Sequence, residues 1–293
     1  MNAVQYLAWA RPLLGLPVPA VGKFFLGLPE ALLGAAGPGH FLESSVGSAR
    51  GLERVKLALI LDEDRPALER DAKRRDAPGK AKAAADLLTA LGEAYDAAPA
   101  RAALAALARW ELRGSLMLSL DYDRPREALD KLSLYGYLPG VKALRELLSV
   151  VGREADEPGL RRLAGEDLAF FGLDLAPGAP AALKLYNKAL LPGPTLPGTL
   201  ARAAQSLSEV APLRDLTTLT RVGSASPPKA YLGFSRGAPL SDLSRLRFFG
   251  ERGWLCAAAK AVPGARARFV GVDDGAFEVY FDAAGFGPAE AAA

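Results

Sequence analysis

The chain has 293 residues, half of them hydrophobic, and a formal net charge of +3. We expect one domain over residues 1–293, because no segment has a convincing linker composition. So small a net charge gives no support for binding to nucleic acid or to a membrane surface. Cys256 is the only cysteine and His40 the only histidine, which excludes an internal disulfide and nearly excludes a His/Cys metal site.

The N-terminal stretch Tyr6–Ala36 is apolar, but Arg11, Lys23 and several prolines interrupt it. A membrane-spanning helix needs about 20 predominantly apolar residues, and a signal peptide needs a charged start followed by a compact apolar run. We therefore expect packed helices and turns in this stretch, and a cytoplasmic protein.

A strand pair recurs five times along the chain, and helical segments separate the copies. Each copy reads as a strand, a polar or Gly/Pro turn, and a second strand, a repeat that indicates the fold. The copies span Phe41–Leu61, Leu116–Tyr137, Asp174–Tyr186, Lys229–Phe249 and Arg268–Phe281. Between the third and fourth copies, Leu213–Pro228 is expected to be a loop. Asp121 and Asp174 are expected to cap turns, with a position facing the lumen as the alternative for Asp121.

Helices are predicted from the spacing of Leu and Ala and from Pro or Gly at the segment ends. They span Arg65–Arg75, Ala81–Tyr95, Arg101–Leu112, Pro139–Val150, Pro158–Ala164, Pro197–Val210 and Glu251–Ala261.

The predicted strands alternate between an apolar face and a face of Lys, Arg, Tyr, Ser and Glu. In the third copy, Leu183 and Leu185 oppose Lys184, Tyr186 and Lys188. Either these are open sheets with one solvated face, or ten antiparallel strands close into an α/β barrel. In the barrel, surrounding helices cover the Leu face and the polar face lines a lumen. Tyr at corresponding positions in four of the five pairs favours the barrel.

In a closed barrel, cations from several strands would converge in the lumen. They are Arg54, Lys56, Lys131, Lys184, Lys229, Arg245, Arg247 and Arg268. Like charges in one cavity imply an anionic ligand, and diphosphate suits Lys and Arg donors. Four tyrosines would lie among them: Tyr135, Tyr186, Tyr231 and Tyr280. Tyrosine rings stabilise a cation, so the combination indicates ionisation of an allylic diphosphate behind walls that exclude water.

These motifs resemble the aromatic prenyltransferases with the ten-stranded antiparallel PT barrel (the ABBA fold), closest to the indole or dimethylallyltryptophan synthase branch. Phe41–Ser45 followed by Arg54-Val-Lys-Leu is similar to the branch's catalytic-Glu strand and its first diphosphate-binding Arg. Lys184-Leu-Tyr186 and Lys229-Ala-Tyr231 are similar to its Lys-x-Tyr pairs, and Tyr280 to its last shielding Tyr. The likeness follows the repeat order over most of the chain, with Ser133 and Phe249 as departures.

The resemblance implies roles for individual residues and a metal-independent reaction without a cofactor. Glu43 would be the base or acceptor-binding group. The diphosphate would be bound by Arg54, Lys131, Lys184, Lys229 and Arg247. Tyr135, Tyr186, Tyr231 and Tyr280 would shield the cation. The expected activity moves a prenyl group, dimethylallyl above all, from its diphosphate to an aromatic small-molecule or peptide acceptor, such as an indole or tryptophan derivative, as in secondary metabolism.

Two other interpretations stay open on the residues alone. In one, a non-catalytic barrel binds an anionic or aromatic small molecule, which Ser133 and Phe249 favour slightly. In the other, an open-sheet scaffold protein carries its Lys and Arg in solvent. Within the barrel, the alternative role of Glu43 is to pair with Arg54 or another barrel cation.

Overall fold

The computed structural model describes residues 41–49, 51–61, 98–109, 116–123, 125–126, 128–137, 141–156, 160, 168–191, 196, 198–224, 229–273 and 276–282. The predicted segments Tyr6–Ala36, Arg65–Arg75 and Ala81–Tyr95, and most of Pro158–Ala164, lie outside these residues. Within the described ranges, no helix combines the length and the apolar character that crossing a membrane requires.

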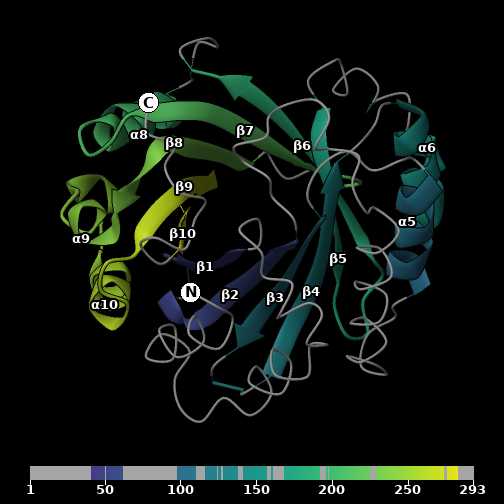
Figure 1. Ribbon diagram of the computed structural model, residues 1–293, viewed down its shortest axis with the longest axis horizontal. Helices are drawn as coiled ribbons and strands as arrows, with labels where there is room; N and C mark the ends of the chain where they lie inside the picture. The colour runs from purple at the N-terminus through teal and green to yellow at the C-terminus, as the bar shows by residue number, and fades with distance from the viewer. Residues whose placement is uncertain are drawn as a thin grey trace.

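One strongly curled antiparallel sheet contains all the described strands (Figure 1). They are β1 (Phe41–Gly47), β2 (Gly51–Leu61), β3 (Leu116–Asp123), β4 (Ala128–Tyr137), β5 (Leu168–Leu175), β6 (Ala182–Leu190), β7 (Leu213–Arg221), β8 (Lys229–Pro239), β9 (Arg266–Asp273) and β10 (Ala276–Asp282). The hydrogen-bonded order is β1-β10-β9-β8-β7-β6-β5-β4-β3-β2. Strand β1 also pairs with β2, so it has an antiparallel neighbour on each side.

Helices lie outside the curl of the sheet, with α5 and α6 on one side and α8, α9 and α10 on the other (Figure 1). The helical elements are α5 (Ala98–Arg109), α6 (Val141–Val150), η3 (Glu154–Asp156), α8 (Gly198–Ser208), α9 (Leu240–Leu243), η4 (Arg247–Phe249) and α10 (Gly253–Ala261). Helix α6 illustrates how these helices pack on the sheet. Its residues Leu144, Leu147 and Leu148 are fully buried, whereas Arg145 and Ser149 are exposed. The i, i+3, i+4 spacing gathers its leucines on one face.

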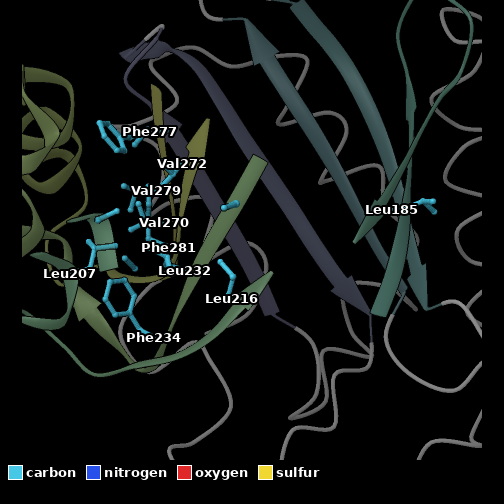
Figure 2. Packing of buried hydrophobic residues seen from close by; sticks show 14 of the residues in the cluster. Leu185, Leu207, Leu216, Leu232, Phe234, Val270, Val272, Phe277, Val279 and Phe281 are labelled. Carbon is cyan, nitrogen blue, oxygen red and sulfur yellow. The ribbon is translucent and has the colours of Figure 1, made fainter. Parts of the chain in front are cut away.

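The main hydrophobic core fills the space between the sheet and these helices. Figure 2 shows Leu207 of α8 near Leu232 and Phe234 of β8, and side chains of β9 and β10 in the same layer. Alternating residues of the same strands point to the other side of the sheet. On β4, for example, Leu132 and Leu134 belong to this core, whereas Tyr135 belongs to a separate inner cluster. The predicted division into an apolar outer face and a polar, aromatic inner face is confirmed on this strand.

In the fourth pair, the first predicted strand, Lys229–Phe234, is part of β8, but the second strand and the preceding loop were predicted wrongly. Leu213–Arg221 is strand β7 rather than a loop, and it pairs with β8. The expected second strand, Arg245–Phe249, is instead a turn followed by the 3₁₀ helix η4. Alternating apolar residues misled the prediction, because Leu246, Phe248 and Phe249 pack on the outer core from a helical turn just as well. Gly250, with φ of 62°, ends that turn.

Candidate active site

A cavity of about 350 Å³ lies on the inner face of the sheet. Every even-numbered strand contributes charged or tyrosine side chains to it. Its principal lining residues are Lys56, Asp121, Lys131, Tyr135, Asp174, Lys184, Tyr186, Leu219, Arg221, Lys229, Tyr231, Asp273, Glu278 and Tyr280. Residues separated by more than two hundred positions therefore share one pocket, a consequence of the pairing of β1 with β10.

Lysines and carboxylates alternate along a network of ion-paired side chains around this cavity. In order they are Lys229, Glu278, Lys56, Asp121, Lys131, Asp174 and Lys184, hereafter the charge chain. It connects β8, β10, β2, β3, β4, β5 and β6. Each ammonium group thus has a carboxylate beside it, as buried charges require.

The two central lysines each lie between two carboxylates. The Lys131 ammonium nitrogen is 3.1 Å from an oxygen of Asp121 and 3.2 Å from one of Asp174. The Lys56 nitrogen is 3.5 Å from Glu278 and 3.9 Å from Asp121. The end lysines, Lys184 and Lys229, form ion pairs with Asp174 and Glu278 respectively. Serine hydroxyls also donate hydrogen bonds to these two carboxylates. The Ser133 hydroxyl donates to Asp174 at 2.6 Å, and the Ser45 hydroxyl donates to Glu278 at 2.8 Å.

Burial and pairing set the protonation states in the charge chain. Burial disfavours the ammonium group of Lys56, but Glu278 and Asp121 outweigh it and hold its pKa well above the ordinary value. The same balance, with Asp121 and Asp174 as partners, raises the pKa of Lys131 to about 12. Burial also disfavours the charged carboxylates of Asp174 and Glu278, yet neighbouring lysines keep their pKa values well below the usual range. Both groups are therefore carboxylates at neutral pH.

A belt of four tyrosines lies next to the charge chain. Tyr135, Tyr186, Tyr231 and Tyr280 come from β4, β6, β8 and β10. Successive ring centroids are 6.0, 6.1 and 5.7 Å apart, and Phe170 stacks on Tyr186 at 4.2 Å. On β6 and β8 the tyrosine follows two residues after a lysine, so both side chains point inward from one strand.

The lysines and tyrosines touch across the strands as well as along them. The Lys229 nitrogen is 5.0 Å from the ring centroid of Tyr231, and the Lys56 nitrogen is 5.2 Å from that of Tyr280. These distances are within the range of cation–π attraction. Burial is the main reason why the pKa values of Tyr231 and Tyr280 are raised, which keeps these phenols neutral. Burial likewise raises the pKa of Tyr186. Burial would also raise the pKa of Tyr135, but Lys184 and Lys56 outweigh it and lower that pKa. Three of the four belt phenols are thus held neutral beside ammonium groups.

Two inward-facing glycines make room for the belt. A Cβ atom on Gly172 of β5 would lie 2.7 Å from the Tyr135 ring, and one on Gly271 of β9 would lie 2.7 Å from the Lys229 side chain. Gly172 is opposite Tyr135 on β4 and Lys184 on β6. Glycine is needed here for close approach of side chains rather than for an unusual φ.

Most of the predicted site residues with described side chains meet in the cavity. Lys131, Lys184 and Lys229 lie in the charge chain, and all four tyrosines form the belt. Glu43 of β1 pairs in the sheet with Ala58 of β2, and Arg54 of β2 pairs with Asp123 of β3. The side chains of Glu43 and Arg54 lie outside the described residues.

Arg247 does not belong to this group. It is exposed on η4 and is not among the residues that line the cavity. The prediction that it would face the lumen was wrong because Arg245–Phe249 is not a strand.

Sequence reasoning missed several residues of the cavity. Asp174 was expected to cap a turn, but inside the cavity it accepts a hydrogen bond from Ser133 and forms an ion pair with Lys131. Strand alternation could have found it, since Leu173 and Leu175 point the other way into the core. Arg221 and Asp273, which form an ion pair of 3.1 Å, were missed for different reasons. Arg221 was hidden by the misassignment of β7, and Asp273 had no motif to mark it.

The arrangement can bind an anion and stabilise a neighbouring cation. Ammonium groups supply charge-assisted hydrogen bonds to phosphate oxygens, and the adjacent rings present their negative faces to a developing carbocation. In the described part of the chain, no group of three or more His, Cys, Asp or Glu side chains is placed to hold a metal ion.

No protein-family model matches the sequence, and neither does any curated protein. Solved structures do match. A 6-dimethylallyl tryptophan synthase is 16% identical, with a TM-score of 0.65 over 98% of both chains. The fold is that of the dimethylallyltryptophan synthases. The 5-dimethylallyltryptophan synthase from Streptomyces coelicolor is 15% identical, with a TM-score of 0.64 over 96% of both chains. The prenyltransferase PriB, in a ternary complex with L-tryptophan and dimethylallyl thiolodiphosphate, is 16% identical with the same TM-score over 96% of each chain.

Proposed function

We propose that this protein is an aromatic prenyltransferase that moves a dimethylallyl group from its diphosphate to an aromatic acceptor, such as an indole or tryptophan derivative or an aromatic side chain of a peptide. One observation carries the proposal: buried ammonium groups and neutral tyrosine rings line the same cavity side by side. A departing diphosphate needs the first and an allyl cation needs the second. The similarity in fold to structures titled as dimethylallyltryptophan synthases supports it.

The framework that we propose is a closed ten-stranded ABBA barrel formed by a single domain over residues 1–293. The pairing of β1 with both β2 and β10 supports closure. A closed wall suits the chemistry, because water that reached the carbocation would quench it.

In the proposed reaction, Lys131, Lys184 and Lys229 bind the diphosphate, together with Arg54 as the sequence resemblance implies. The allylic C–O bond breaks, and its electron pair leaves with the diphosphate oxygen. The allyl cation lies against Tyr186, Tyr231 and the other rings of the belt. An aromatic ring atom of the acceptor then forms a bond to the allyl carbon, and Glu43 accepts the proton that the ring loses. The lysines balance the charge of the leaving group without a metal ion.

The direct test is incubation of the purified protein with dimethylallyl diphosphate, L-tryptophan and EDTA, followed by mass spectrometry. We expect a product that has gained one dimethylallyl group in place of hydrogen. Lys229→Gln should lower kcat/KM by about 10- to 100-fold, since a charge-assisted hydrogen bond contributes roughly 1.5–3 kcal/mol. Arg245→Gln is the control, because Arg245 is exposed and pairs with Asp242 outside the cavity. Absence of product with tryptophan and with a panel of other aromatic acceptors would contradict the proposal.

The second candidate is a non-catalytic protein that binds an anionic or aromatic small molecule. One feature of the charge chain favours this candidate. Asp174 and Glu278 already neutralise lysines that would otherwise bind a diphosphate. Binding of dimethylallyl diphosphate without any turnover would select this function.

A further inference from the structure

The lysines of the charge chain are unequally neutralised. Among the described side chains, Lys56 and Lys131 each lie between two carboxylates, whereas Lys184 and Lys229, at the two ends of the charge chain, each pair with one. The positive charge that remains available to a ligand is therefore concentrated at the two ends of the charge chain, on β6 and β8.

Strand β7 lies between these two ends. Its residue Leu219 is the register partner of Lys229, and Arg221 is the register partner of Lys184. Both Leu219 and Arg221 line the cavity. Between the two end lysines, the inner face of β7 thus presents an apolar side chain and, next to it, a guanidinium group.

Among the described residues, the Arg221 guanidinium group forms an ion pair with one carboxylate. Its Nη2 atom is 3.1 Å from Oδ2 of Asp273, which also lines the cavity, at the end of β9. The two side chains are 36% and 31% exposed, whereas the lysines of the charge chain are all below 20%. A half-exposed ion pair contributes little stability and is easily exchanged for a better partner.

We propose that Arg221 is a further donor-binding cation, which leaves Asp273 and pairs with the terminal phosphate of a prenyl diphosphate held between Lys184 and Lys229. This inference rests on the proposed function and adds a residue and an exchange of partners to it. A guanidinium group forms two parallel hydrogen bonds with a phosphate, which a single Oδ2 contact with Asp273 does not match. Asp273 therefore acts as a competitor that holds Arg221 at the rim until the donor binds.

The experiment is a calorimetric titration, with EDTA present, using dimethylallyl thiolodiphosphate as a donor analogue and dimethylallyl monophosphate as a shorter probe. Arg221→Gln should weaken binding of the thiolodiphosphate about 10-fold, and Arg221→Lys should restore part of it. Asp273→Asn should tighten binding about 3-fold, because it releases Arg221. Neither Arg221 variant should change the affinity for the monophosphate, which lacks the terminal phosphate.

The matched controls are Arg245→Gln and Asp242→Asn, which remove one charge each from an exposed ion pair of 3.6 Å outside the cavity. They report the effect of net charge alone and should leave both affinities unchanged.

The outcomes separate this inference from the function on which it rests. If the wild type binds the thiolodiphosphate and Lys229→Gln does not, but Arg221→Gln binds as the wild type does, the role of Arg221 is overturned and the proposed function stands. If Asp273→Asn weakens binding as much as Arg221→Gln, the pair is structural and the exchange of partners is overturned. If the wild type binds neither probe, both proposals fall.

Discussion

Lys184 differs from the other lysines of the charge chain in its titration. Burial lowers its pKa, although the neighbouring Tyr135 and Asp174 oppose this effect. The pKa values of Lys56, Lys131 and Lys229 are all raised. In the free protein, Lys184 is therefore the first of the four to lose its proton as the pH rises, and it gains most from an added anion.

A pH-dependent loss of donor binding is the expected consequence. An anionic donor binds the protonated lysine, so affinity for dimethylallyl thiolodiphosphate should fall as the pH rises through the lowered pKa of Lys184. Lys184→Arg stays charged over this range, so its affinity should remain constant while that of the wild type declines. Calorimetric titration between about pH 7 and about pH 10 measures both, a range that lies below the ordinary lysine pKa of about 10.4.

Lys229→Arg is the matched control, because the pKa of Lys229 is raised and its replacement should not alter the pH profile. A parallel decline in the wild type and in Lys184→Arg would show that another group controls the loss of binding.

Gly172 offers a second test at the residue scale. In Gly172→Ala the new Cβ atom would lie 2.7 and 2.8 Å from two carbons of the Tyr135 ring and 3.3 Å from Tyr186. Both rings are buried and cannot move away freely, so we expect a loss of about 1–3 kcal/mol in the free energy of unfolding. Activity should fall as well, because the belt is displaced. Urea denaturation measures the stability, with Gly253→Ala as the control, since its Cβ atom would meet nothing within 4 Å. Equal stability of the two variants would contradict the close packing of the belt.

At the scale of secondary structure, the periodicities of β4 and α6 were sufficient for prediction. Leu132, Leu134 and Tyr135 fall on the faces that a period of two requires, and α6 begins at Val141, within the predicted Pro139–Val150. Strand β7 was not predictable in this way. Its threonines were read with the Gly, Ser and Pro residues that follow as loop composition, although β-branched residues also favour strands. Pairing with β6 and β8, which the sequence does not display, decides between the two.

The amphipathic helix α6 allows a direct test of the outer core. Leu147 is fully buried, and Leu147→Ala removes three carbon atoms from a packed interior. We expect a loss of about 2–5 kcal/mol in the free energy of unfolding. Ser149→Ala on the exposed face of the same helix should change it by less than about 0.5 kcal/mol. Similar effects of the two substitutions in urea denaturation would mean that α6 does not pack on the sheet through its leucines.

At the scale of the whole molecule, the charge chain joins strands from both ends of the sequence. Glu278 of β10 contacts Lys56 of β2 and Lys229 of β8, and Asp174 of β5 contacts Lys131 of β4 and Lys184 of β6. The alternation of strands indicates which of these side chains face inward. It does not reveal which carboxylate meets which lysine, because that depends on the register and stagger of strands far apart in the sequence. The cavity was therefore predictable as a list of inward residues but not as an alternating network.

Acid should weaken this network and with it the fold. Asp174 and Glu278 have pKa values in the folded protein below those of the unfolded chain, which are about 3.9 and about 4.3. Their contribution to stability is thus fully present above the unfolded values and is lost as the pH falls toward the folded ones. At about pH 3, each carboxylate should have lost about 1–2 kcal/mol of stabilisation relative to pH 7.

Asp174→Asn separates this contribution from general acid denaturation. The variant should be less stable than the wild type at pH 7, because Lys131 and Lys184 lose their shared partner. The difference between the two should shrink by about 1 kcal/mol at pH 3, since the wild type then binds a proton on unfolding at the same site. Asp242→Asn changes an exposed carboxylate outside the cavity and should follow the wild type at both pH values. If the gap between the wild type and Asp174→Asn is the same at pH 3 as at pH 7, Asp174 is not held as a carboxylate by its lysines, and the alternating network is not what stabilises the cavity.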